Sequence, residues 1–525
     1  MKPLVEIFDS TLRDGAQGEG ISFSVEDKLA VARLLDGLGV AYIEAGNPGS
    51  NPKDLEFFRR SGELKLQNSR LVAFGSTRRK GVKAEDDANV QALLTANTDV
   101  VALFGKCWDL HVRDILQTTE EENFAMIADT VAFFKRRGKR VVFDAEHFFD
   151  GYKANPLFAM KALEAAADAG TDVLALCDTN GGAFPQEIYD ITRAVVDRFG
   201  PMVGIHTHND GGMAVANSIM AVSAGATHVQ GTYLGFGERS GNANLSTIIP
   251  NLQLKLGYAC IPQDNMPRLT EVARSMAEVA NIRLGRGEPY VGSSAFAHKA
   301  GMHADGVLKN SATFEHINPE AVGNERRFLM SEVSGRGAVL EKIRRFCPAI
   351  QKSSPELKTI IDELKRMELE GYQYEGADGS FELLVRKCLG RLTPYFDLVY
   401  YRITGEKPHV PDQSAVATLK VQVGDQSQIA AGEGNGPVNA LDKALRSALA
   451  GFYPSLANVH LVDYKVRVMD SKQATAARVR VLITSTDGVK EWTTVGVAGD
   501  VIEASWAALS DSIEYKLVSE GEAAG

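Results

Sequence analysis

The feature that most constrains the fold is a series of eight short β-type runs before residue 240, most of them separated by amphipathic segments. The intervening segments Val25–Leu38, Asn123–Arg137 and Pro156–Ala169 carry apolar residues near the 3.6-residue period of a helix. Alternating strands and helices form a parallel sheet, and eight such units in about 240 residues predict a (β/α)₈ barrel. The runs are Val5–Phe8, Ala41–Glu44, Leu71–Phe74, Val100–Phe104, Arg140–Asp144, Val173–Cys177, Val203–His206 and His228–Thr232.

A doubly wound open sheet is the alternative for this α/β pattern. Such a sheet usually has fewer strands, and its first strand is often followed by a G-x-G-x-x-G motif. No such motif follows Val5–Phe8. We therefore favour the closed barrel.

A chain of 525 residues is expected to contain two or three domains. After the predicted barrel, the pattern of expected secondary structure changes twice. Residues 269–396 are mainly helical, and from Asp397 the chain returns to alternating strands. We predict a barrel domain over residues 1–268, a mainly helical linker over 269–396 and an α+β domain over 397–518. The last domain contains a weak internal repeat of two strand-rich units, each closed by a helix. Its clearest strands are Ala415–Val423, Asn458–Val468, Ala477–Thr484 and Trp492–Val497.

The composition excludes several classes of protein. The chain has 57 basic and 67 acidic residues, and the resulting net charge of −10 argues against a nucleic-acid binder. Five scattered cysteines without a C-x-x-C motif are typical of reduced thiols in the cytoplasm. The first residues lack a long apolar stretch after a basic start, and no window approaches the roughly 18 apolar residues of a membrane span. We expect a cytoplasmic protein without membrane contact.

Two separated signatures predict a metal site. Arg13 and Asp14 follow the first β-type run, and His206-Thr207-His208 ends the seventh. Residues two apart in a strand face the same side, so the two histidines project together. A carboxylate beside two imidazoles offers the mixed oxygen and nitrogen ligands that divalent metals accept. An isolated H-x-H is more often packing or surface, and the joint occurrence with Asp14 is what favours a metal.

Other polar residues also collect where the β-type runs end. In a (β/α)₈ barrel the chemistry lies at the carboxyl ends of the strands, so these side chains are expected to converge on one site. They include Glu44, Ser76-Thr77-Arg78, Lys106, Asp144 with Glu146, and Asp178 with Thr179.

The motifs resemble those of the metal-dependent Claisen condensation enzymes, a pyruvate-carboxyltransferase-like family that includes the 2-isopropylmalate, homocitrate and citramalate synthases. Leu12 to Lys28 fits the first family signature, His206 to Ala216 fits the second, and Gly237 to Asn244 is similar to the segment after the eighth strand. The resemblance covers essentially the whole chain, including a C-terminal regulatory domain like that of 2-isopropylmalate synthases. The segments most like citramalate synthases are Pro48–Asp54, Phe104–His111 and Asp144–Gly151.

The resemblance implies an acyltransferase that condenses acetyl-CoA with pyruvate and hydrolyses the thioester to citramalate and CoA, for isoleucine biosynthesis. One divalent ion, Mn²⁺, Zn²⁺ or Mg²⁺, would bind Asp14, His206 and His208. Asn242 is the implied fourth ligand, and a loop hydrogen bond is its alternative role. The metal would act as a Lewis acid on the pyruvate carbonyl.

The resemblance also assigns roles to the remaining site residues. Arg13 would stabilise negative charge on the reacting oxygen. Thr179 would bind the pyruvate carboxylate, and Glu44 would orient Arg13 unless it forms only a structural ion pair. Glu146 is a candidate base or base-orienting group.

The base itself is expected to be a histidine, because deprotonating a thioester methyl near neutral pH suits an imidazole. His303, after the barrel, matches the family histidine that in relatives can reach the site from a partner subunit. His298 is its rival on the same segment. The run Arg78-Arg79-Lys80 could attract CoA phosphates, although a solvated loop is its commoner fate.

The C-terminal domain is expected to form a homodimer and to bind isoleucine, with Gly434–Asn439 and Gly496–Asp500 as the candidate pocket because helix starts can receive a carboxylate. A dimerisation module without a ligand is the alternative. Three other functions remain open for the whole chain. They are a sister synthase for a larger 2-oxo acid (2-isopropylmalate or homocitrate synthase), a lyase or decarboxylase, and a non-catalytic sensor.

Overall fold

The computed structural model describes residues 4–298, 301–328, 336–410, 413–469 and 478–523. Two compact units are present. The first comprises Met1–Phe296 with His316–Arg326, and the second comprises Ala297–Glu315 with Arg327–Gly525. The three-domain boundaries expected from the sequence remain a prediction.

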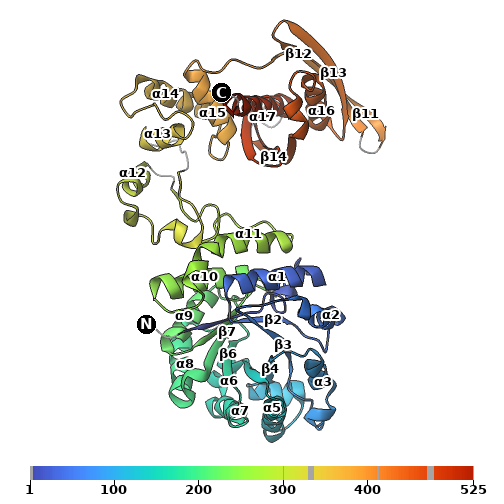
Figure 1. Cartoon of the computed structure of the whole chain (residues 1–525), viewed down its shortest axis with the longest axis vertical. Helices are drawn as coiled ribbons and strands as arrows, with labels where there is room; N and C mark the ends of the chain where they lie inside the picture. Colours follow the sequence, from blue (N-terminus) through green and yellow to red (C-terminus); the bar gives the residue numbers. More distant parts are fainter. Residues whose placement is uncertain (1–3, 299–300, 329–335, 411–412, 470–477, 524–525) are drawn as a thin grey trace. The chain divides into compact units, whose positions relative to one another are not determined.

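The first unit is a closed eight-stranded parallel barrel with strand order β1 to β8, which confirms the predicted fold class. Strand β8 closes the barrel on β1 through the pairs Glu6↔His228 to Asp9↔Gly231. The helices surround the strands (Figure 1). The strands are β1 Glu6–Asp9, β2 Tyr42–Gly46, β3 Arg70–Ser76, β4 Val100–Lys106, β5 Arg140–Glu146, β6 Val173–Asp178, β7 Val203–Thr207 and β8 His228–Gly231.

Local sequence signals account for the helix boundaries. Helix α1 spans Val25–Leu38, as predicted, because Ser24 and Asp27 form a capping box and Gly39 ends the helix with φ 96°. A π-helical turn, Val112–Leu116, follows the short α4 and was not predicted. The other helices of this unit are α2 Pro52–Arg60, α3 Ala88–Thr95, α4 Asp109–His111, α5 Glu120–Lys135, α6 Phe148–Ala154, α7 Pro156–Asp168, α8 Pro185–Phe199, α9 Ala214–Ala224, α10 Leu245–Pro250 and α11 Leu269–Val279.

Two apolar layers hold the barrel together. Alternate strand residues point to opposite faces, so Ile7 and Val101 pack outward against the helices while Phe8 and Ala102 fill the interior. The interior layer closes one end of the barrel and leaves the carboxyl ends of the strands for polar side chains.

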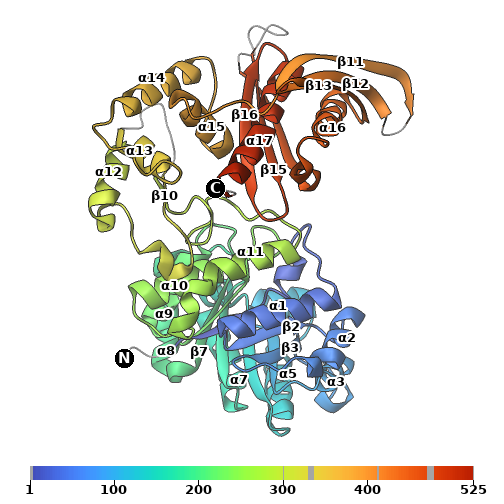
Figure 2. The same cartoon turned by 45° about the horizontal axis from the view of Figure 1, so that its top comes forward.

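The second unit contains two three-stranded antiparallel sheets, β11-β12-β13 and β14-β15-β16. Helix α16 packs on the first sheet and α17 on the second, which confirms the predicted repeat (Figure 2). Strands β11 and β13 were not predicted individually, and Ala477, the predicted start of one strand, lies outside the described residues. The elements are β9 Ala297–His298, α12 Gly301–Lys309, β10 Arg327–Phe328, α13 Arg336–Arg344, α14 Pro355–Leu369, α15 Asp378–Cys388, β11 Asp397–Val410, β12 Gln413–Val423, β13 Gln426–Gly434, α16 Pro437–Leu449, β14 His460–Val468, β15 Val479–Thr486, β16 Glu491–Ala498 and α17 Val501–Ala523.

Two further observations concern the cysteines and the possibility of a membrane span. All five cysteines carry free thiols, in agreement with the expectation of reduced cysteines. Among the described residues, no helix combines the length and apolar character needed to cross a membrane.

Candidate active site and metal centre

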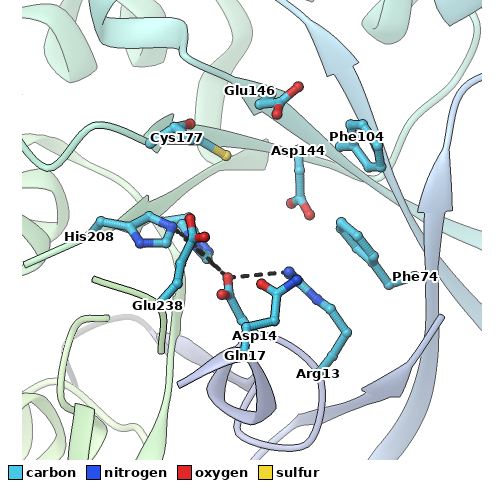
Figure 3. A pocket seen from close by; sticks show the side chains of 12 residues that line it. Arg13, Asp14, Gln17, Phe74, Phe104, Asp144, Glu146, Cys177, His208 and Glu238 are labelled. Atoms are coloured by element: carbon cyan, nitrogen blue, oxygen red, sulfur yellow. Dashed lines mark hydrogen bonds and ion pairs between the residues drawn. The ribbon is translucent and has the colours of Figure 1, made fainter. Parts of the chain in front are cut away.

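The predicted polar residues of the barrel converge on a cavity of about 230 Å³ at the carboxyl ends of the strands. Figure 3 shows side chains from the loop after β1, from strands β3 to β6 and from the segments after β7 and β8 around this cavity. The cavity is lined by Arg13, Asp14, Gln17, Phe74, Phe104, Asp144, Glu146, Cys177, Thr179, His206, His208 and Glu238.

Asp14, His206 and His208 lie close enough to share one ion. Their potential ligand atoms all lie within 4.8 Å of one another, and all three residues are buried. The Nε2 atoms of the two histidines are 3.2 Å apart. Asp14 Oδ2 lies 3.5 Å from His206 Nε2 and 4.0 Å from His208 Nε2. Two nitrogens each about 2.1 Å from an ion and about 100° apart would be separated by about 3.2 Å. The spacing fits a pair of neighbouring ligands.

Gln230 of β8 fixes the tautomer of His206. The Gln230 amide donates from Nε2 to Asp144 Oδ1 at 2.7 Å, so its Oε1 atom faces His206 Nδ1 at 2.9 Å and accepts a hydrogen bond from the Nδ1–H group. The His206 Nε2 atom, toward Asp14 and His208, then carries a free lone pair. A hydrogen bond at the far nitrogen is the usual support of a metal-binding histidine.

Asn242 supplies a further oxygen beside the triad. Its Nδ2 donates to the Phe236 carbonyl at 3.0 Å, while its buried Oδ1 has no hydrogen-bond partner among the described residues. Backbone pairing joins Asn242 to His208, and the Asn242 side chain helps to lower the pKa of Asp14. An unpartnered buried oxygen at this place fits a fourth metal ligand, a role that remains a prediction.

The electrostatics favour the metal-binding forms of the triad. Burial opposes ionisation of Asp14, but the neighbouring charge of Arg13 foremost outweighs burial and lowers the pKa of Asp14. Burial, together with His206, lowers the pKa of His208 to about 3. Burial also lowers the pKa of His206. The site therefore presents a carboxylate and two neutral imidazoles, the protonation states that metal binding requires.

Arg13 is held rigidly beside the triad. Its Nε donates to Glu44 Oε2 at 2.6 Å, its Nη1 lies 3.3 Å from Asp14 Oδ2, and its guanidinium stacks over Phe74 at 3.7 Å from the ring centroid. Glu44 is fully buried and also accepts a hydrogen bond from Ser10. Glu44 thus contacts Arg13 as the orienting role requires.

Glu146 and Thr179 line the same cavity and are each fixed by a neighbour. Lys106, at the end of β4, forms an ion pair with Glu146. The His147 backbone N–H donates to Thr179 Oγ1 at 2.8 Å, and His147 adopts a left-handed backbone with φ 56° to do so. Because Thr179 Oγ1 already accepts this bond, its hydroxyl proton is available for a ligand in the cavity.

Two predicted histidines lie in the second unit. His303 is exposed on α12 and stacks on Phe314 with ring centroids 4.2 Å apart. His298 Nε2 lies 3.1 Å from the buried carboxylate of Glu315. A histidine held by a buried carboxylate is less available than an exposed one, which favours His303 as the candidate base. That role remains a prediction.

The basic run after β3 is largely engaged in structure. Arg78 is buried and forms ion pairs with Glu122 and Asp129, and Arg79 pairs with Asp87. Lys80 instead donates to the carbonyl oxygens of Leu116 and Gln117. Arg78 is thus structural, whereas Arg79 and Lys80 remain exposed on the loop.

Sequence reasoning missed three contributors to the site. Gln230 lies within a correctly predicted strand, and its polar side chain between Val229 and Gly231 in that strand was the available signal. Phe74 and Phe104 end predicted strands and were interpreted only as strand residues, yet their rings stack 5.3 Å apart against the cavity.

Comparison with known proteins agrees with this geometry. The HMGL-like family model matches residues 4–275, just over half of the chain. The chain belongs to the HMGL-like family. Two further family models match the rest, the homocitrate synthase post-HMGL domain over residues 290–371 and the LeuA allosteric (dimerisation) domain over residues 375–517.

Several members of the family are similar to the chain over its full length. The (R)-citramalate synthase of Aquifex aeolicus is 53% identical over 99% of both chains, and that of Synechocystis sp. is 49% identical over 97% of this chain and 96% of its own. A probable 2-isopropylmalate synthase of Methanopyrus kandleri is 32% identical over 96% of this chain and 97% of its own. Within the family, the chain groups with the citramalate synthases.

Proposed function

We propose that this protein is an acyltransferase that joins the methyl carbon of acetyl-CoA to the keto carbon of pyruvate and releases citramalate and CoA. The convergence of Asp14, His206 and His208 with Arg13 and Thr179 in one small cavity carries the proposal. A small 2-oxo acid needs a cation for its carbonyl and a hydroxyl or amide donor for its carboxylate, and the cavity offers both. The similarity to curated citramalate synthases supports the same reaction.

Asp14, His206, His208 and Asn242 would hold the divalent ion, with Mn²⁺, Zn²⁺ and Mg²⁺ as candidates. The bound ion supplies Lewis acidity at the carbonyl of the 2-oxo acid. The protein's own part is to keep both imidazoles neutral and to fix the His206 tautomer through Gln230.

Arg13 stabilises the negative charge that develops on the keto oxygen when the new carbon–carbon bond forms. Its guanidinium is already oriented by Glu44 and Phe74, so little reorganisation is required in the transition state. Such preorganised charge is typically worth about 3 kcal/mol of barrier for each donor. Thr179 binds the carboxylate of pyruvate through its hydroxyl proton.

A base must take one proton from the acetyl methyl group before the bond forms. We assign Glu146 and His303 to this step, with His303 contributed by its own or a partner subunit. The electron pair of the broken C–H bond attacks the keto carbon, the C=O π electrons move to the keto oxygen, and that oxygen takes a proton equivalent to the one removed from the methyl group to become the tertiary hydroxyl. Water then cleaves the thioester, so that the acyl carbon becomes a carboxylate and the sulfur leaves as CoA.

The aromatic wall of the cavity favours pyruvate over larger 2-oxo acids. Phe74 and Phe104 occupy space that a branched or dicarboxylic side chain would need. A 2-isopropylmalate or homocitrate synthase would require a larger pocket beside the keto carbon. The preference for a methyl ketone therefore rests on these two rings.

The C-terminal repeat supports a dimeric, regulated enzyme. The match to an allosteric dimerisation domain over residues 375–517 supports a homodimer, and by the family resemblance the effector is isoleucine, the end product of the pathway. The cytoplasm is the expected location of such a biosynthetic enzyme.

The direct test is release of free CoA from acetyl-CoA, measured with a thiol reagent and a panel of 2-oxo acids. We expect the highest kcat/KM with pyruvate, loss of turnover after chelation, and recovery with added Mn²⁺, Zn²⁺ or Mg²⁺. A higher kcat/KM for 2-oxoisovalerate would indicate a sister synthase. Turnover by a His208→Ala variant in metal-free buffer would contradict the metal assignment.

A further inference from the structure

Two segments that resemble citramalate synthases in sequence, Phe104–His111 and Asp144–Gly151, pack against each other in the structure. A Cβ atom on Gly151 would lie only 2.1 Å from the Cys107 carbonyl oxygen, so the two backbones meet at a distance that only glycine permits. The Cys107 backbone N–H also donates to the Glu146 carbonyl at 3.2 Å. The two segments therefore form one packed unit beside the candidate base.

Within this unit, His147 has a left-handed backbone with φ 56° and ψ 32°. Residues other than glycine are uncommon in this region, and those that are held there cluster at functional sites. The His147 ring packs against two rings of the other segment, with centroids 4.4 Å from His111 and 5.9 Å from Trp108. Its Nδ1 atom lies 3.4 Å from Asp150 Oδ2, and this contact is the main reason why the pKa of Asp150 is lowered. Contacts of the ring thus stabilise the unusual backbone.

The left-handed conformation directs the His147 backbone N–H to Thr179 Oγ1, which accepts it at 2.8 Å. The main chain around Thr179 is fixed independently. Arg239 Nη2 donates to the Thr179 carbonyl at 2.8 Å, and Asn180 Nδ2 donates to Asp150 Oδ2 at 2.8 Å. A threonine hydroxyl can still rotate about its C–O bond, and a hydrogen bond accepted by its oxygen restricts where its proton points. His147 supplies that restriction at the wall of the cavity.

We propose that His147 is a positioning residue for the 2-oxo acid, and that its left-handed backbone directs the Thr179 hydroxyl proton to the substrate carboxylate. His147 does not line the cavity itself, so it acts through Thr179. The inference rests on the proposed function, which assigns the carboxylate to Thr179. It extends that function by giving the two packed segments a role in substrate binding. The role holds for any 2-oxo acid, because each carries the same carboxylate.

The test compares two replacements of His147 that both remove the ring but differ in backbone preference. A β-branched residue is strongly disfavoured in the left-handed region, whereas asparagine is enriched there. We expect His147→Val to raise the KM for pyruvate about tenfold and His147→Asn to keep it within about threefold, because a hydrogen bond to a charged group is worth roughly this much. The KM for acetyl-CoA should stay the same in both variants. Release of free CoA measures both constants.

Asn97→Val is the matched control. Asn97 also has a left-handed backbone, with φ 53°, and it is exposed on the same unit without lining the cavity. This variant carries the same kind of backbone penalty, so its melting temperature should fall while its KM for pyruvate stays unchanged. If His147→Val folds poorly, His147→Ala has a smaller backbone penalty and should give a KM between those of His147→Asn and His147→Val.

A double-mutant cycle with Thr179→Val tests whether His147 acts through Thr179. Calorimetric titration of pyruvate into the Mn²⁺-loaded full chain measures the affinity without acetyl-CoA. We expect Thr179→Val to weaken binding and the addition of His147→Val to weaken it no further, since residues that act through one contact are not additive. Additive losses would overturn the proposal, as would a wild-type affinity in His147→Val beside a weakened Thr179→Val. A wild-type affinity in Thr179→Val would contradict the carboxylate assignment of the proposed function and overturn this inference with it.

Discussion

Gln230 illustrates how a neutral side chain can determine the state of a metal ligand. Its amide oxygen accepts a hydrogen bond from His206 Nδ1–H and its amide nitrogen donates to Asp144, so the imidazole cannot rotate or change tautomer without breaking a buried hydrogen bond. Burial, followed by the charge of Glu44, raises the pKa of Asp144. The Gln230 amide hydrogen bond opposes that rise. The metal ligands thus depend on a residue that does not reach the ion.

A Gln230→Leu variant should therefore bind metal more weakly, although all proposed ligands remain. The expected loss is about 10- to 100-fold in affinity, the usual effect of removing a partner of a metal-bound histidine. Calorimetric titration of Mn²⁺ into the full chain measures it. Thr270→Val is the control, because it removes another buried hydrogen bond of the same unit, to the Val322 carbonyl. Equal metal affinity in the wild type and Gln230→Leu would show that His206 needs no such support.

At the scale of elements, the helices and strands were predictable because the sequence signals that define each one lie within its own residues. The capping box of α1 and the apolar runs of β4 to β7 need only their own residues to be recognised. The site was predictable in part, because the ends of parallel strands converge wherever a barrel closes. Contacts between distant residues were not predictable. Gln230 and Asp144 are 86 residues apart, and no local pattern indicates that their side chains meet.

The position of Phe104, in β4, was likewise not predictable from its local sequence, and it leads to a testable prediction. As an apolar residue of a buried strand it is expected in the core, yet its ring lines the cavity that contains the proposed metal ligands. Phe104→Ala should shift the substrate preference about tenfold from pyruvate toward 2-oxobutyrate, since one methylene of space is worth about 10- to 200-fold in discrimination. The preference is measured as the ratio of the two kcat/KM values with the same thioester, so altered CoA binding cancels. Phe124→Ala, at a ring that packs at a tilt against Phe158 and does not line this cavity, should leave the ratio unchanged.

At the scale of the whole molecule, the two helix starts of the C-terminal repeat differ in a way that their similar sequences do not reveal. Asp500 already accepts hydrogen bonds from the Ile502 and Glu503 backbone N–H groups at the start of α17. Helix α16 begins after Gly436 without any side-chain cap. Of the two segments predicted to receive the carboxylate of isoleucine, Gly434–Asn439 therefore has the freer N–H groups.

Isoleucine at millimolar concentration should give a binding isotherm with the full chain and slow the release of CoA. Coupling of this kind requires isoleucine to bind the less active state more tightly. Asn439→Asp is isosteric and adds a negative charge in the first turn of α16, so it should weaken isoleucine binding about tenfold by repelling the carboxylate. A negative charge in the first turn also stabilises a helix, so the melting temperature of the variant should not fall. Asp500→Asn on α17 should leave binding unchanged. Weaker binding in Asp500→Asn and unchanged binding in Asn439→Asp would place the effector site at the start of α17. If isoleucine produces neither a heat of binding nor inhibition, dimerisation is the remaining role of the repeat.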